Sequence, residues 1–121
     1  MSLWVFDVDG CLDAAPRQLQ TMMAALQSAG HGVYILTGTP NDPVTQQDWT
    51  EKANYINSLG CNNYDVLVVL STGDRHDIPQ RKAQWLAEHK ADVLVDNDRE
   101  NCKAATLAGV PLVLLPWASR Q

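Results

Sequence analysis

Cysteine is scarce in this chain of 121 residues, and its distribution argues against two common kinds of site. Cys11, Cys61 and Cys102 are far apart, odd in number and form no C-x-x-C pair. A disulfide framework and a zinc site built from cysteines are therefore not expected. A reducing, cytoplasmic compartment is the simplest assignment.

The sequence also lacks long apolar runs and an excess of basic residues. No apolar run is long enough to span a bilayer, and no secretion signal is recognisable, so no membrane partner is expected. The net charge of −5 disfavours a surface that grips nucleic acid as a whole. With no internal repeat or low-complexity tract and 45% hydrophobic residues, residues 1–121 are expected to form one domain.

What the sequence does contain is an alternation of short apolar runs with amphipathic segments. The apolar runs cover residues 3–6, 33–36, 66–70, 93–95 and 112–115. Continuous runs of this kind are typical of strands buried on both faces. The segments between them have helical spacing, and Asp42-Pro43 is expected to begin the second helix. The pattern predicts an α/β fold with a parallel sheet covered by helices on both faces.

Small polar and acidic residues follow the predicted strands, where ligands bind in such sheets. Asp7 and Asp9 are two residues apart, so an extended backbone points their side chains the same way. A divalent cation would relieve their repulsion, and oxygen ligands without histidine or thiolate favour Mg²⁺. A carboxylate can also attack a phosphoryl group, with a second carboxyl as general acid and base. Thr37, the Gly38 N–H and Lys82 would bind phosphate oxygens.

Four segments resemble, in order, the four motifs of the haloacid dehalogenase (HAD) superfamily of phosphohydrolases. They are residues 5–12 (VFDVDGCL), residues 35–38 (ILTG), Lys82 and residues 95–101 (VDNDREN). The resemblance implies a three-layer Rossmann-like HAD fold with a five-stranded parallel sheet in the order 3-2-1-4-5. Neither connection where this family inserts a cap domain has room for one, so a capless member with an open site is expected.

The resemblance also implies a role for each matched residue. Asp7 would be the nucleophile and a Mg²⁺ ligand, and Asp9 the general acid/base with its main-chain carbonyl on the metal. Thr37 would bind the transferring phosphoryl group, and Lys82 would stabilise Asp7 and the phosphoryl charge. Asp96 would hold Mg²⁺, with Asp98 as the alternative inner ligand. Gly38, Asn97 and Asp98 would surround the substrate.

The function expected on this basis is a Mg²⁺-dependent phosphomonoester hydrolase with an aspartyl-phosphate intermediate. Its substrate would be a small phosphomonoester such as a nucleotide, or a phosphorylated nucleic-acid end. Residues 71–77 faintly resemble the 3′-phosphatase domain of polynucleotide kinase-phosphatases.

The alternative is a non-enzymatic phosphate- or metal-binding module on the same fold, or a subunit of a larger assembly. The sequence leaves open whether the chain forms a homo-oligomer. This alternative is kept open because Asn97 separates Asp96 from Asp98, whereas the family often has two consecutive acids. A phospho-acceptor signalling domain is disfavoured, because its acceptor follows the third strand, where this chain has Ser71-Thr72-Gly73.

Overall fold

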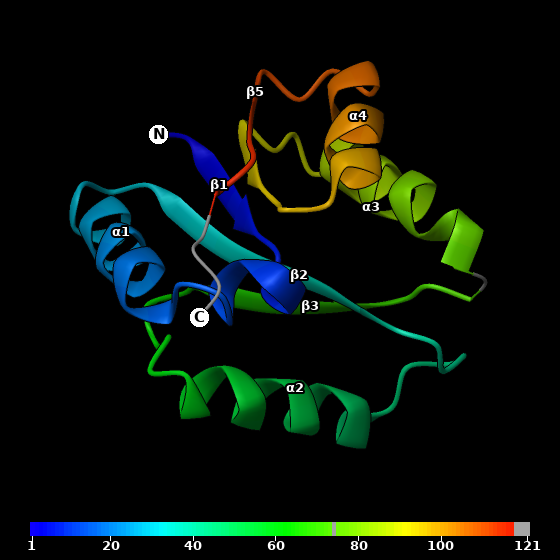
Figure 1. The fold of residues 1–121 in the computed structure, drawn as a ribbon, viewed down its shortest axis with the longest axis horizontal. Coiled ribbons are helices and arrows are strands. Elements are labelled where there is room, and N and C mark those ends of the chain that lie inside the picture. The colour runs from blue at the N-terminus through cyan, green and yellow to red at the C-terminus, as the bar shows by residue number, and fades with distance from the viewer. Residues whose placement is uncertain (74, 118–121) are drawn as a thin grey trace.

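The structure, a computed structural model that describes residues 1–73 and 75–117, contains one sheet of five parallel strands in the order β3-β2-β1-β4-β5 (Figure 1). The strands are β1 (Leu3–Phe6), β2 (Gly32–Thr39), β3 (Val66–Ser71), β4 (Val93–Val95) and β5 (Leu112–Leu114). This arrangement confirms the predicted Rossmann-like α/β architecture and its strand order.

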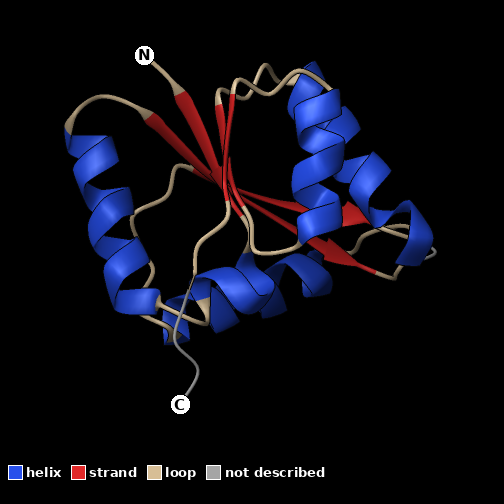
Figure 2. Ribbon diagram, turned by 45° about the horizontal axis from the view of Figure 1, so that its top comes forward, coloured by secondary structure: helices blue, strands red, loops and turns tan. Residues whose placement is uncertain are grey.

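Helices cover both faces of the sheet (Figure 2). They are α1 (Pro16–Ser28), α2 (Gln46–Ser58), α3 (Ile78–Glu88) and α4 (Arg99–Leu107), with short helical turns η1 (Val8–Leu12) and η2 (Arg75–Asp77). One core cluster joins the sheet to α1 and α2, and a second joins it to α3 and α4. Val5 and Phe6 of β1 are fully buried in opposite clusters, as expected for a central strand. No helix within the described ranges is both long and apolar enough to cross a membrane.

The strand β2 is longer than the sequence predicts. Thr37 and Gly38, expected to end it, lie within the strand, because β3 continues beside them to Ser71. Gly38 suits this place, since a Cβ there would lie 2.3 Å from Cγ2 of Thr72. The extension carries β2 beyond the end of its other neighbour, β1, whose pairing with β2 stops at Ile35.

The predicted beginning of the second helix at Asp42-Pro43 is wrong. Helix α2 begins at Gln46, and Thr45 is its N-cap. The Thr45 hydroxyl accepts from the Asp48 N–H (3.2 Å), and the Asp48 carboxylate accepts from the Thr45 N–H (2.8 Å). This reciprocal pair satisfies two N–H groups that a helix otherwise leaves unpaired. These two hydrogen bonds therefore set the start of α2 at Gln46, three residues after Pro43.

Candidate functional site

A cavity of about 920 Å³ opens at the carboxyl ends of β1 and β2 and beside the beginnings of α3 and α4. Most of the residues selected from the sequence line it: Asp7, Asp9, Thr37, Gly38, Lys82, Asn97 and Asp98. Asp96 lies beneath this wall, is fully buried, and reaches the others through Lys82. The structure thus brings together selected residues that are up to 91 positions apart in the sequence, counted between Asp7 and Asp98.

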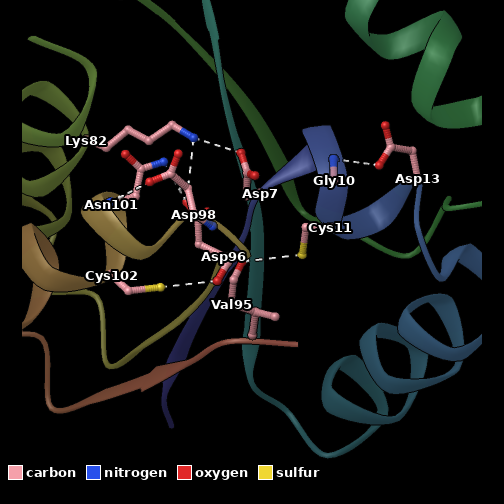
Figure 3. A network of polar contacts seen from close by, with 10 residues as sticks. All are labelled: Asp7, Gly10, Cys11, Asp13, Lys82, Val95, Asp96, Asp98, Asn101 and Cys102. Carbon is pink, nitrogen blue, oxygen red and sulfur yellow. Dashed lines mark hydrogen bonds and ion pairs between the residues drawn. The ribbon is translucent and has the colours of Figure 1, made fainter. Parts of the chain in front are cut away.

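The centre of the site is a buried cluster of one ammonium and two carboxylates (Figure 3). Nζ of Lys82 donates to Oδ1 of Asp7 at 2.7 Å and lies 3.7 Å from Oδ2 of Asp96. Backbone bonds hold both acids: the Asp7 N–H donates to the Val95 carbonyl, and the Asp96 N–H donates to the Leu114 carbonyl. The register of the central strands therefore sets the separation of the carboxylates. The expectation that Lys82 lies beside Asp7 is met geometrically.

Burial and charge act in opposite directions on the pKa values of this cluster. Burial raises the pKa of Asp7 to about 6, although the neighbouring Lys82 ammonium opposes the rise. Burial likewise raises the pKa of Asp96 against the effect of Lys82. For Lys82, burial lowers the pKa, but the Asp7 and Asp96 carboxylates outweigh it, so that the pKa is raised. The ammonium is thus kept charged, while Asp7 is poised to change charge near neutral pH.

Asp96 and Asp98 have different surroundings, which distinguishes the two acids that the sequence left as alternatives. Oδ1 of Asp96 accepts from the Asp98 N–H (2.9 Å), and Oδ2 accepts from Nδ2 of Asn101 (3.1 Å). Asp98 is the N-cap of α4, accepting from the N–H groups of Glu100 (2.8 Å) and Asn101 (3.1 Å). Asp96 therefore faces the cluster, and Asp98 holds the helix start.

The turn after β1 is fixed from two sides. The Gly10 N–H donates to Oδ1 of Asp13 at 2.6 Å, and the Tyr55 hydroxyl of α2 donates to Oδ2 of the same carboxylate at 3.2 Å. Gly10 has φ of +73°, and a Cβ there would lie 2.3 Å from Nδ2 of Asn97. Glycine is therefore required both by the left-handed backbone and by the close approach of Asn97. Asp9, which precedes Gly10, is exposed at the cavity wall.

Thr37 brings a buried hydroxyl to the cavity. The residue is 1% exposed, and its hydroxyl makes no hydrogen bond to any other described residue. Because Thr37 lines the cavity and its hydroxyl has no protein partner among the described residues, this hydroxyl is available to a ligand. The Cys11 thiol, by contrast, donates to the Val95 carbonyl (3.6 Å), and burial raises its pKa. Cys11 is thus a packed thiol rather than a reactive one.

Four residues of the cavity wall were not among the site residues expected from the sequence. Lys52 of α2 and Arg99 of α4 add positive charge, and Thr72 and Asn101 add polar groups. Arg99 and Asn101 lie within the segment 95–101 that resembles the fourth motif, so their position offered a clue. Lys52 lies in an ordinary charged stretch of a surface helix and has no recognisable signal in the sequence.

The predicted Mg²⁺ site is formed in part. Asp7 and Asp96 face one another across the Lys82 ammonium, whereas the Asp9 side chain is not drawn into the cluster. Within residues 1–73 and 75–117, no group of three or more His, Cys, Asp or Glu side chains is arranged to hold a metal ion. Two carboxylates completed by ligand phosphates and water still form a donor set that Mg²⁺ accepts. Mg²⁺ therefore stays a prediction.

Solved structures of universal stress proteins share this fold. The universal stress protein from Archaeoglobus fulgidus in complex with dAMP matches with a TM-score of 0.59 and 20% identity, over 96% of this chain and 98% of that one. A second structure of a universal stress protein from Archaeoglobus fulgidus gives a TM-score of 0.61 and 17% identity, over 96% and 94% of the two chains. No family model and no curated protein matches the chain.

These matches overturn the resemblance to HAD phosphohydrolases and the Mg²⁺-dependent phosphomonoester hydrolase that it implied. The matched structures are universal stress proteins, and one holds dAMP. The physical reason for the error lies in the motifs themselves. Short acidic, threonine and glycine segments after strands suit any parallel α/β sheet, since every such sheet gathers polar groups at its carboxyl edge. The phosphatase assignment and the roles of Asp7 as nucleophile and Asp9 as general acid/base are accordingly withdrawn.

Proposed function

We propose that this protein is a non-enzymatic module that binds a nucleotide in the cavity at the carboxyl ends of β1 and β2. The observation that carries the proposal is the unpartnered Thr37 hydroxyl in the same cavity wall as the Lys82 ammonium. An ammonium has three donors, and of the described residues only Asp7 accepts a hydrogen bond from it, because Oδ2 of Asp96 lies 3.7 Å away, so N–H donors remain for a phosphate oxygen. A cavity of about 920 Å³ is also within the size range of small-molecule sites.

The charges of the wall favour a ligand that brings a cation. The acids Asp7, Asp9, Asp98 and Glu100 outnumber the bases Lys52, Lys82 and Arg99 in the lining. A bare phosphate would meet this excess of carboxylates, whereas Mg²⁺ beside the Asp7 carboxylate, which lines the cavity, would offset it. The cation would supply charge neutralisation for the phosphate. The dAMP named in the complex of the Archaeoglobus protein supports the choice of a nucleotide as the first ligand to test.

The test is a calorimetric titration with dAMP and with inorganic phosphate, each in Mg²⁺ and in EDTA. We expect both to bind, more tightly in Mg²⁺, and the nucleotide to be recovered unchanged after incubation. A 3′-phosphorylated oligonucleotide serves as the competing ligand, because an open site would also admit a nucleic-acid end.

Thr37→Val keeps the shape of the side chain and removes the hydroxyl, so it should weaken phosphate and dAMP binding about tenfold, the value of one hydrogen bond. Thr21→Val is the matched control, since the Thr21 hydroxyl bonds only its own helix, at the Arg17 carbonyl. The absence of binding by either ligand, or an equal loss in both variants, would contradict the proposal.

A further inference from the structure

A second hollow adjoins the cavity at the strand ends and shares part of its wall. Its volume is about 580 Å³, and it lies between the beginning of α3 and the length of α4, from Asp98 to Leu107. The shared residues are Ile78, Asp98, Glu100 and Asn101. The two spaces are therefore neighbours, and a ligand held in the first cavity lies beside the second.

The second hollow combines apolar and polar walls. Its apolar side chains are those of Ile78, Pro79, Ala104 and Leu107. Leu107 is 83% exposed, although it stands beside a concave surface. The other residues of the wall are polar or charged: His76, Gln80, Asp98, Glu100, Asn101 and Lys103. Apolar side chains beside several hydrogen-bonding groups suit a flat heteroaromatic ring, which has apolar faces and polar edges.

The charges at the junction give the ligand a direction. Asp98 and Glu100 stand in the wall common to both spaces, and their carboxylates disfavour a phosphate there. The Lys82 ammonium and the Thr37 hydroxyl belong to the first cavity alone. A nucleotide is therefore oriented with its phosphate toward Lys82 and its base toward Leu107.

We infer that the second hollow is the nucleobase subsite of this protein, so that a nucleotide lies along α4 and the beginning of α3. The inference rests on the proposed function and adds to it the place and orientation of the base. It also explains how a site with an acidic majority can select a nucleotide over free phosphate, since the base contributes contacts remote from the carboxylates.

The test compares Gln80→Trp with Gln84→Trp in titrations with dAMP and with inorganic phosphate. Both glutamines are exposed on α3, but Gln84 lies one turn further along the helix and outside both cavities. The indole at position 80 should fill the second hollow. We expect Gln80→Trp to weaken dAMP binding at least tenfold and to leave phosphate binding unchanged, and Gln84→Trp to alter neither.

An independent measurement uses the unmodified chain. In NMR titrations, dAMP should shift the amide signals of Lys103, Ala104 and Leu107, whereas inorganic phosphate should shift those near Thr37 and leave α4 beyond its first turn unchanged. Phosphate binding with no preference for dAMP, or with no nucleotide-specific shift in α4, would overturn the subsite alone. If neither ligand bound, the proposed function would fall and the subsite with it.

Discussion

Asp7 combines two properties that are costly together, namely deep burial and a negative charge at neutral pH. Asp7 is 6% exposed, and one neighbouring ammonium, that of Lys82, balances the negative charge of its carboxylate. Burial nevertheless dominates and raises its pKa to about 6. A protein gains nothing in stability from such a group, so the arrangement indicates that the charge serves the cavity.

The raised pKa predicts how stability varies with pH. The folded state holds the Asp7 proton more tightly than the unfolded state, in which the carboxyl has its ordinary pKa of 3.8. Folding therefore binds a proton between about pH 4 and 6. The contribution of Asp7 is therefore favourable below this window and is lost as the pH rises through it. Asp7→Asn, which resembles the protonated form, should match the wild type near pH 4 and exceed its free energy of unfolding at pH 7 by on the order of 2–3 kcal/mol.

Urea unfolding in EDTA at pH 4, 5, 6 and 7 measures this difference. Asp65→Asn would not be a neutral control, because Asp65 accepts from the Val33 N–H and from Gln27. Asp42→Asn is better suited, since Asp42 is exposed and accepts no side-chain hydrogen bond from the described residues. A difference between Asp7→Asn and wild type that stays constant with pH would show that the pKa of Asp7 is not raised.

At the scale of single elements, substitutions before α2 can show whether Thr45 or Asp42 stabilises the start of this helix. Thr45→Ala removes the hydroxyl that accepts from the Asp48 N–H and should lower the free energy of unfolding by about 1 kcal/mol. Thr45→Ser keeps the hydroxyl and should restore most of the loss. Asp42→Ala should change stability by less than about 0.5 kcal/mol, the usual effect of a surface substitution. Thermal or urea unfolding measures the stability of the three variants. A larger loss of unfolding free energy in Asp42→Ala than in Thr45→Ala would show that Asp42, and not Thr45, is the N-cap of α2.

The elements also show how far the sequence alone leads. Residues 93–95 were placed exactly as β4, because a three-residue apolar run between polar residues has no helical alternative. The ends of β2 and the start of α2 were missed, because they depend on pairing with β3 and on the Thr45–Asp48 bonds, which no periodicity records. Lys82 was selected correctly as a neighbour of Asp7, since the strand order brings α3 beside β1. Lys52 was not, because an ordinary surface charge gains meaning only from the folded wall.

For the whole molecule, the main consequence of the strand order is that both cores contribute to one site. Thr37 of β2 and Lys52 of α2 belong to the half that packs with α1 and α2, whereas Lys82 and Arg99 come from the helices on the other face. Unfolding of either half destroys the cavity. A ligand that binds only the complete cavity therefore stabilises both halves by the same amount.

This linkage predicts that bound dAMP stabilises the whole fold. At a free dAMP concentration ten times its Kd, the free energy of unfolding should rise by about 1.4 kcal/mol, and Tm by about 3–6 °C for a chain of this size. Hydrogen exchange at the buried amides of Ala53 and Ile56 in α2 and of Leu86 in α3 should slow by the same factor, about tenfold, because all three open with the whole fold. Thr37→Val should reduce both effects at the same dAMP concentration. Protection confined to α3 and α4 would instead mean that the nucleotide is held by one face of the sheet, and that Thr37 and Lys52 take no part in binding it.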